Sequence, residues 1–280
     1  MKNTFLLLFC LILSFGFAPK SLTWVALGDS ITYLNDHQNE TGNRISKGYL
    51  TLVTDKFPNV EVINKGYNGW TAVKIATDFD KLAIPKADVY SIFLGTNDWW
   101  GGKDLGTFED YQNATGTGTV YGSFRVIIDN LRGLNDQAEI ILITPMQRVD
   151  FVYINDYKNN ALGSYREKDG QQLDEFADAI AAIGKAEDFQ VVDLYHQKGM
   201  DHSRLVKFKR LKNPQTGEYK KYKYPDFIDV PFDPAVDEYP YPEKSINVSY
   251  DGLHPSDKGY RMIAKELLPI FKEFTKGMKK

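Results

Sequence analysis

Cysteine is nearly absent from this 280-residue sequence, in which Cys10 is the only one. Disulfide frameworks, cysteine-based zinc sites and cysteine nucleophiles are therefore excluded as its main chemistry. The sequence also lacks an excess of positive charge. Its net charge of −3 does not predict the basic face that nucleic-acid binding usually requires. Of the four histidines, His196 and His202 lack the partner pattern typical of zinc, so we expect no metal and no cofactor.

The first eighteen residues have the pattern of a secretory signal peptide. Lys2 supplies a positive start, residues 5–15 are apolar, and residues 16–18 (Gly-Phe-Ala) form a small-x-small cleavage site. We expect the mature protein to begin near Pro19, to lack Cys10 and to be secreted or periplasmic. A buried N-terminal helix or a membrane anchor is the alternative. The apolar run is short for a bilayer span, so we expect no stable membrane insertion.

From residue 19 to 280, short β-branched runs alternate with longer amphipathic stretches, without repeats or low-complexity linkers. Strands are predicted over 22–27, 60–63, 89–94, 139–143 and 190–192, and helices over 49–57, 71–82, 120–134, 168–186 and 255–276. This alternation predicts one α/β domain with about five parallel strands between two helical layers. The segment 197–250 breaks the rhythm, and we interpret it as an insertion that caps or walls the site.

In parallel sheets of this kind, sites lie at the carboxyl ends of the strands. The loops after the first three predicted strands contain residues 28–30 (Gly-Asp-Ser), 66–70 (Gly-Tyr-Asn-Gly-Trp) and 95–98 (Gly-Thr-Asn-Asp). All three are rich in glycine and carry polar groups beside buried strands. These loops are where we expect the chemistry.

A nucleophile, a base and an orienting carboxylate can be assigned. Ser30 follows the first strand at a strand-to-helix turn, although serine at such a point is also a common helix N-cap. Asp251 and His254 lie in one tight turn before the last helix, with Pro255 as its first residue. The carboxylate could orient one imidazole nitrogen and leave the other for Ser30. The alternative is a surface histidine near a capping aspartate.

If these three groups transfer an acyl group to water, the developing oxyanion also needs hydrogen-bond donors. The backbone N–H groups of Ser30 and Gly69 and the side-chain amide of Asn97 are the candidates. Gly69 allows close backbone approach, and the amide of Asn97 is neutral at any working pH. A turn glycine and a loop-capping asparagine are the plainer interpretations of these two residues.

These segments, in this order, resemble the four sequence blocks of the SGNH (GDSL-like) hydrolases: residues 28–30, Gly69, residues 95–98 and residues 251–254. The resemblance implies a flavodoxin-like three-layer α/β/α fold. It also implies a metal-free triad of Ser30, His254 and Asp251, with Ser30, Gly69 and Asn97 as the oxyanion hole. Two departures are Trp70, where relatives often carry a small polar or acidic residue, and the long insertion. No Gly-x-Ser-x-Gly motif of the α/β-hydrolase elbow occurs.

Aromatic residues suggest the substrate. Trp70, Trp99 and Trp100 follow the oxyanion candidates and could form a substrate-binding platform, while the insertion mixes tyrosines with charged residues. Such amphipathic aromatics suit sugar rings better than long acyl chains, although packing onto the core would explain many of them. Our hypothesis is a secreted esterase that removes short acyl groups, acetyl above all, from acylated carbohydrate. The alternatives are a lipase or lysophospholipase of the same fold and a non-catalytic glycan-binding protein.

Overall fold

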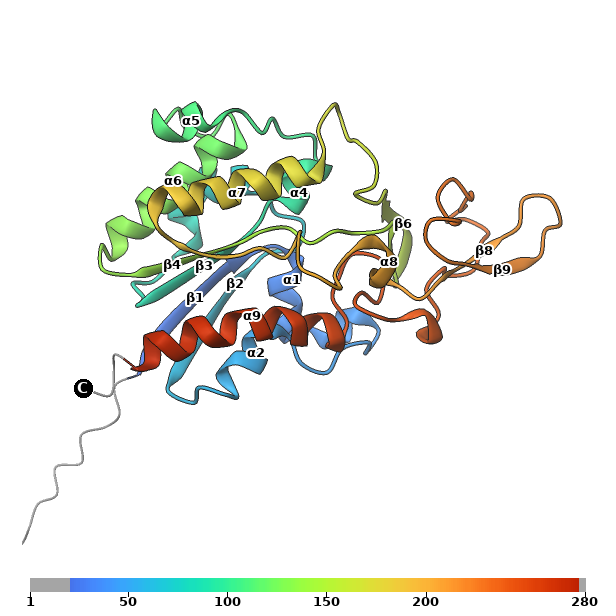
Figure 1. The fold of residues 1–280 in the computed structure, drawn as a ribbon, viewed down its shortest axis with the longest axis horizontal. Helices are drawn as coiled ribbons and strands as arrows, with labels where there is room; N and C mark the ends of the chain where they lie inside the picture. The colour runs from blue at the N-terminus through green and yellow to red at the C-terminus, as the bar shows by residue number, and fades with distance from the viewer. Residues whose placement is uncertain (1–20, 277–280) are drawn as a thin grey trace, which may run out of the picture.

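The computed structural model describes residues 21–276 and has a central parallel sheet of five strands in the order β2-β1-β3-β4-β7 (Figure 1). The strands are β1 (Leu22–Gly28), β2 (Val60–Gly66), β3 (Val89–Phe93), β4 (Glu139–Ile143) and β7 (Gln190–Val192). In the register of the sheet, Gly28 pairs with Gly66 on one side and with Phe93 on the other. The first three strands therefore end at one level, and the loops that follow them start side by side.

Helices cover both faces of the sheet and complete three layers (Figure 1). One face carries α2 (Tyr49–Thr54) and α9 (Asp257–Lys276), and the other carries α3 (Ala72–Thr77), α6 (Val120–Leu134) and α7 (Leu173–Glu187). Along β1, Trp24 and Ala26 pack into the first layer, whereas Val25 and Leu27 pack into the second. Burying one large apolar side chain stabilises a fold by about 1.5–3 kcal/mol. The predicted α/β fold is confirmed.

Shorter elements connect these layers. They are α1 (Ser30–Tyr33), η1 (Leu34–Asp36), η2 (Gln38–Thr41), η3 (Phe79–Leu82), α4 (Thr96–Trp100), α5 (Phe108–Gln112), α8 (His202–Leu205) and η4 (Glu243–Ser245). Two antiparallel hairpins, β5 (Phe151–Tyr153) with β6 (Asp156–Ala161) and β8 (Lys209–Lys212) with β9 (Tyr219–Tyr222), extend beyond the end of the sheet (Figure 1).

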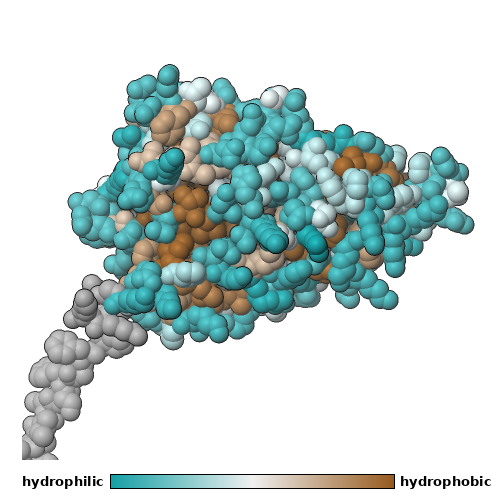
Figure 2. All heavy atoms as spheres, in the orientation of Figure 1, coloured by the Kyte–Doolittle hydropathy of each residue, from teal (hydrophilic) through white to brown (hydrophobic). Residues whose placement is uncertain are grey.

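The surface in this view is mostly hydrophilic, with apolar residues gathered between α7 and α9 (Figure 2). Among the described residues, the large hydrophobic side chains classed as exposed are Leu162 and Val236. No helix between residues 21 and 276 combines the length and apolar character that a membrane crossing requires.

The elements differ from their predicted bounds in two instructive places. The helix predicted over 71–82 is divided, because Asp78 leaves helical geometry between α3 and η3 while its carboxylate binds both Lys74 and Lys81. The last helix begins at Asp257, and Pro255 pairs with Ser249 in an isolated bridge instead of starting the helix. The predicted signal peptide, residues 1–18, lies outside the described residues, and the single domain stays a prediction.

Candidate active site

Ser30 stands where β1 passes into α1, with its hydroxyl free of any capping role. The residue before it, Asp29, is the N-cap, and its carboxylate accepts a hydrogen bond from the N–H of Ile31 at 2.9 Å. Burial raises the pKa of Asp29 to about 6. Because Asp29 satisfies the helix start, the plainer interpretation of Ser30 as an N-cap does not apply.

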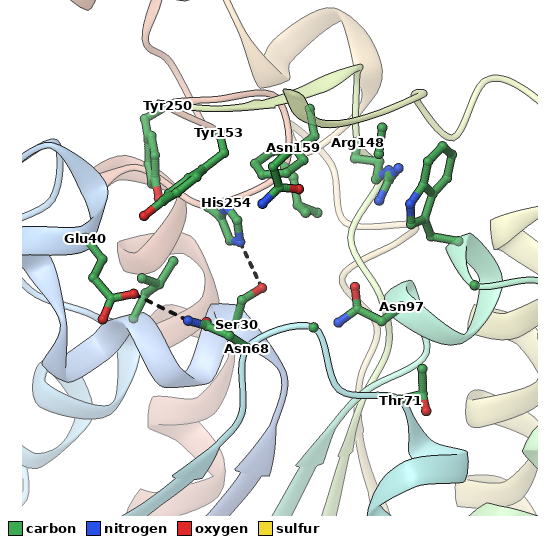
Figure 3. A pocket seen from close by; sticks show the side chains of 17 residues that line it. Ser30, Glu40, Asn68, Thr71, Asn97, Arg148, Tyr153, Asn159, Tyr250 and His254 are labelled. Atoms are coloured by element: carbon green, nitrogen blue, oxygen red, sulfur yellow. Dashed lines mark hydrogen bonds between the residues drawn. The ribbon is translucent and has the colours of Figure 1, made fainter. Parts of the chain in front are cut away.

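Ser30, His254 and Asp251 form one continuous hydrogen-bonded chain. The Oγ of Ser30 lies 2.8 Å from Nε2 of His254, and Nδ1 of His254 lies 2.7 Å from Oδ2 of Asp251. With Asp251 ionised, Nδ1 carries the imidazole hydrogen and Nε2 accepts from the serine hydroxyl. Figure 3 shows the Ser30–His254 bond at the centre of the cavity. The geometry is that of a nucleophile, a general base and the group that orients the base.

The turn that carries Asp251 and His254 is fixed from both sides. Oδ1 of Asp251 accepts the N–H groups of Leu253 at 3.0 Å and of His254 at 2.7 Å. Gly252 has a φ of +97°, and a Cβ there would lie 2.1 Å from the carbonyl oxygen of Asp150. Only glycine fits this crossing, so the turn and the segment beside Asp150 are locked together.

The three predicted oxyanion donors border one cavity. Ser30, Gly69 and Asn97 all line it, and the φ of Gly69 is +73°. Nδ2 of Asn97 donates one hydrogen to the carbonyl oxygen of Trp70 at 3.0 Å, which orients the amide and leaves its second hydrogen for a ligand. The structure thus brings these donors together at the carboxyl edge of the sheet.

Asp98 joins the two loops that carry Gly69 and Asn97. Its carboxylate accepts the backbone N–H groups of Ala72 at 2.8 Å and of Val73 at 3.3 Å. Burial raises the pKa of Asp98 to about 6 against the opposing effect of these hydrogen bonds. Asp98 therefore positions the loop that carries Gly69, although Asp98 itself does not line the cavity.

The cavity has a volume of about 430 Å³. Besides the predicted residues, its walls include side chains that the sequence did not single out (Figure 3): Leu34, Glu40, Asn68, Thr71, Arg148, Phe151, Tyr153, Asn159, Ala161 and Leu253. Polar and aromatic groups outnumber aliphatic ones in this set. One signal could have found Arg148, because it follows the end of β4 at the same carboxyl edge as the three glycine-rich loops.

The expected platform of three tryptophans does not form. Trp100 lines the cavity, but Trp99 is fully buried and donates its Nε1 hydrogen to the carbonyl of Gln171 at 3.0 Å. Neighbouring residues on α4 point about 100° apart, and here Trp99 packs into the core while Trp100 faces the cavity. Trp70 stacks on Tyr67 at 4.5 Å between ring centres and does not line the cavity. The prediction of substrate contact is therefore wrong for Trp99.

The insertion 197–250 supports the cavity wall more than it forms it. Of its residues, Tyr250 alone lines the cavity, and the wall beside His254 comes from residues 148–161. Behind that wall, Tyr239 donates to the carbonyl of Val152 at 3.1 Å, and Lys209 forms a 2.7 Å ion pair with Asp150. The expectation that the insertion itself walls the site is corrected accordingly.

A three-layer α/β fold with a serine, histidine and aspartate at its carboxyl edge defines a class of serine hydrolase-like proteins. The chain belongs to the GDSL-like lipase/acylhydrolase family, whose model matches residues 26–262. It is therefore an acylhydrolase whose substrates are esters. The resemblance drawn from the four sequence blocks is confirmed.

Several solved structures resemble this chain. A crystal structure described as a possible lipase from Chitinophaga pinensis is 58% identical, with a TM-score of 0.89, and the match covers 91% of this chain and 99% of that one. A protein from Lactobacillus plantarum has a TM-score of 0.57 at 21% identity over 90% and 98% of the chains. A mutant acetyl-xylooligosaccharide esterase from Geobacillus has a TM-score of 0.51 at 19% identity, covering 90% and 94%. No match was found among curated proteins.

Proposed function

We propose that this protein is a serine esterase in which Ser30 is the nucleophile, His254 the general base and acid, and Asp251 the orienting group. The observation that carries the proposal is the 2.8 Å approach of Nε2 of His254 to Oγ of Ser30, with Asp251 on the other imidazole nitrogen. Ser30 attacks the ester carbonyl as His254 takes its proton. His254 then protonates the departing alcohol, and water releases the acyl group by the same route in reverse.

The negative charge that forms on the carbonyl oxygen needs preorganised donors. The N–H groups of Ser30 and Gly69 and the free amide hydrogen of Asn97 border the space beside the Ser30 hydroxyl. One donor of this kind contributes a factor of about 10²–10³ to the rate.

We propose acetyl and other short acyl esters of carbohydrates as the substrates. The cavity offers aromatic rings in Trp100, Phe151 and Tyr153 together with polar groups such as Asn68 and Asn159. This mixture supports a sugar better than a long acyl chain, which would need a continuous aliphatic groove. A lipase is the second candidate, because the 58% identical protein is described as a possible lipase.

The experiment is acetate release by the protein from acetylated xylan, acetylated pectin and simple sugar acetates, compared with 4-nitrophenyl esters of increasing chain length. Ser30→Ala is the negative control, and Ser203→Ala, which changes an exposed serine, is the matched positive control. Acetate release that is lost only with Ser30→Ala supports the proposal. Preference for acyl chains longer than about eight carbons would favour the lipase. Glycan binding without any turnover would favour a binding protein.

We further propose that residues 1–18 are a signal peptide and that the protein acts outside the cytoplasm. The pattern of Lys2, an apolar stretch and residues 16–18 supports this. Expression of the full chain in a bacterial host, followed by N-terminal sequencing of the exported protein, tests it. A product that retains residues 1–18 would contradict the proposal.

A further inference from the structure

Arg148 is a buried arginine beside the candidate nucleophile. It follows β4, lines the same cavity as Ser30 and has 1% of its surface exposed. Figure 3 shows Arg148 on the side of the cavity where Asn97 lies. A charged side chain so deeply buried needs partners that either neutralise it or give it a function.

The guanidinium is held in one orientation. Its Nε and Nη2 donate to the carbonyl oxygen of Leu162 at 3.0 and 2.6 Å, and its centre lies 5.0 Å from the ring of Trp99 and 4.9 Å from that of Trp100. The backbone N–H of Arg148 donates to Oγ of Ser164 at 3.0 Å. Such restraint is the preorganisation that a binding group requires.

The positive charge has no carboxylate of its own. Burial lowers the pKa of Arg148 to about 10, which still leaves the group cationic at neutral pH. Among residues 21–276, no carboxylate forms an ion pair with it, because Asp150 pairs with Lys209 and Asp251 pairs with His254. Within the same residues, Nη1 makes no hydrogen bond. The Nη1 end of the guanidinium is thus left to bind a ligand in the cavity.

We propose that Arg148 binds a carboxylate on the alcohol part of the substrate, so that the preferred esters are those of acidic sugars. This inference rests on the proposed esterase function and narrows its substrate class. Nη1 and the second hydrogen of Nη2 provide the parallel pair of donors that a carboxylate accepts. A single guanidinium near Asp150 and Asp251 matches one negative charge, whereas a phosphate dianion would bring two.

The proposed acyl group decides which part of the ester carries the carboxylate. Arg148 lies on the side of the cavity where Asn97 lies, and His254 lies on the side of Tyr153 and Tyr250 (Figure 3). An acetyl group carries no carboxylate of its own. In an acetylated sugar, the carboxylate that binds Arg148 therefore belongs to the alcohol part, which extends across the cavity from His254.

The side of the cavity opposite Arg148 is unfavourable for a carboxylate. Glu40 lines that side, with Ser30 between it and Arg148 (Figure 3). Its Oε1 accepts from the hydroxyl of Tyr33 at 2.9 Å and its Oε2 from Nδ2 of Asn68 at 3.4 Å. A substrate carboxylate would be repelled by Glu40, while sugar hydroxyls can donate to it.

The test compares acetate release from an acetylated galacturonic acid glycoside and from its methyl ester, which is larger by one methyl group and has no charge. For the wild-type protein, we expect kcat/KM for the acid to exceed that for the methyl ester by at least about 30-fold. In Arg148→Gln, this preference should fall by at least about tenfold, mainly through KM for the acid. Arg148→Lys keeps the charge and loses the paired donors. Its preference for the acid should lie between that of the wild-type protein and that of Arg148→Gln. Arg166→Gln is the matched control, because this arginine binds Asp229 away from the cavity.

Equal kcat/KM values for the acid and its methyl ester in the wild-type protein would overturn the proposal, even if the Arg148 variants fail to fold. So would a stronger preference for a hemisuccinate, whose charge is on the acyl part, or for a sugar phosphate. If no ester at all is hydrolysed, 4-nitrophenyl acetate included, the proposed function fails. Calorimetry with galacturonate and galactose then tests Arg148 alone, and equal binding of both sugars would overturn its assignment.

Discussion

The two regions that border the cavity differ in how they are held. The catalytic edge consists of the loops at residues 28–30, 66–70 and 95–98, each of which continues directly from a strand of the parallel sheet. The wall consists of residues 148–161 and depends on side-chain contacts with the insertion behind it. The sheet therefore fixes Ser30 and the oxyanion donors, whereas the less regular wall holds the turn of Asp251 and His254 and, in our proposal, sets the choice of ester.

The largest effect should come from the catalytic edge itself. Ser30→Ala removes the nucleophile, and we expect kcat to fall by about 10⁴-fold or more, with the unfolding temperature nearly unchanged. Initial rates with 4-nitrophenyl acetate and a thermal melt measure both. A variant that retains a tenth of the wild-type activity would show that Ser30 is not the nucleophile.

Asn97 lies at the catalytic edge and Asn159 lies in the wall, so removing each amide tests how the two regions differ. Asn97→Ala should lower kcat by about 10²–10³-fold, since its amide acts on the transition state. Asn159→Ala should instead raise KM by about threefold to tenfold, as expected for loss of a contact made equally in the bound state. Steady-state kinetics with a sugar acetate separates the two. A pure KM effect of Asn97→Ala would remove this residue from the oxyanion hole.

The same contrast explains what the sequence could predict. Runs such as Glu139–Ile143 and Gln190–Val192 match their strands because β-branched and aliphatic residues fit a sheet buried on both faces. The triad could be proposed because its residues lie in glycine-framed turns at a strand end and before the last helix, and the structure places the three side chains within hydrogen-bonding distance. Local pattern was sufficient to predict these strands and to propose these residues.

The wall could not be predicted in this way. The strand Asp156–Ala161 has no alternation of apolar and polar residues, and its position depends on pairing with Phe151–Tyr153. The roles of Trp99 and Trp100 depend on where α4 begins, which decides which ring faces the core. Both features are set by tertiary contacts between distant segments.

Lys209→Met tests whether the insertion supports the wall. The Lys209 side chain is 3% exposed and forms an ion pair with Asp150, so its loss leaves a largely buried carboxylate without its cation. We expect the free energy of unfolding to fall by about 3 kcal/mol, together with a rise in KM as the wall loosens. Urea unfolding and steady-state kinetics measure these effects. Lys221→Met, on the exposed face of the same hairpin, is the control. An unchanged KM would mean that the wall keeps its shape without this support.

The smallest effect concerns how the catalytic edge responds to pH. Burial raises the pKa of Asp98 from 3.8 to about 6, so between these values the folded protein holds a proton that the unfolded chain has released. The stability that this group contributes is fully present below pH 3.8 and is lost as the pH rises through about 6. The loss is at most about 1.4 kcal/mol per pH unit.

Asp98→Asn removes this titration and also weakens the hydrogen bonds to Ala72 and Val73. The variant should be less stable than the wild-type protein, but its deficit in the free energy of unfolding should shrink as the pH rises from about 4 to 7. Urea unfolding at four pH values measures the deficit, with the exposed Asp136→Asn as a reference for loss of a surface carboxyl. A deficit that grows with pH would mean that Asp98 is stabilised in its charged form. The hydrogen bonds from Ala72 and Val73 would then have more effect than burial on the pKa of Asp98.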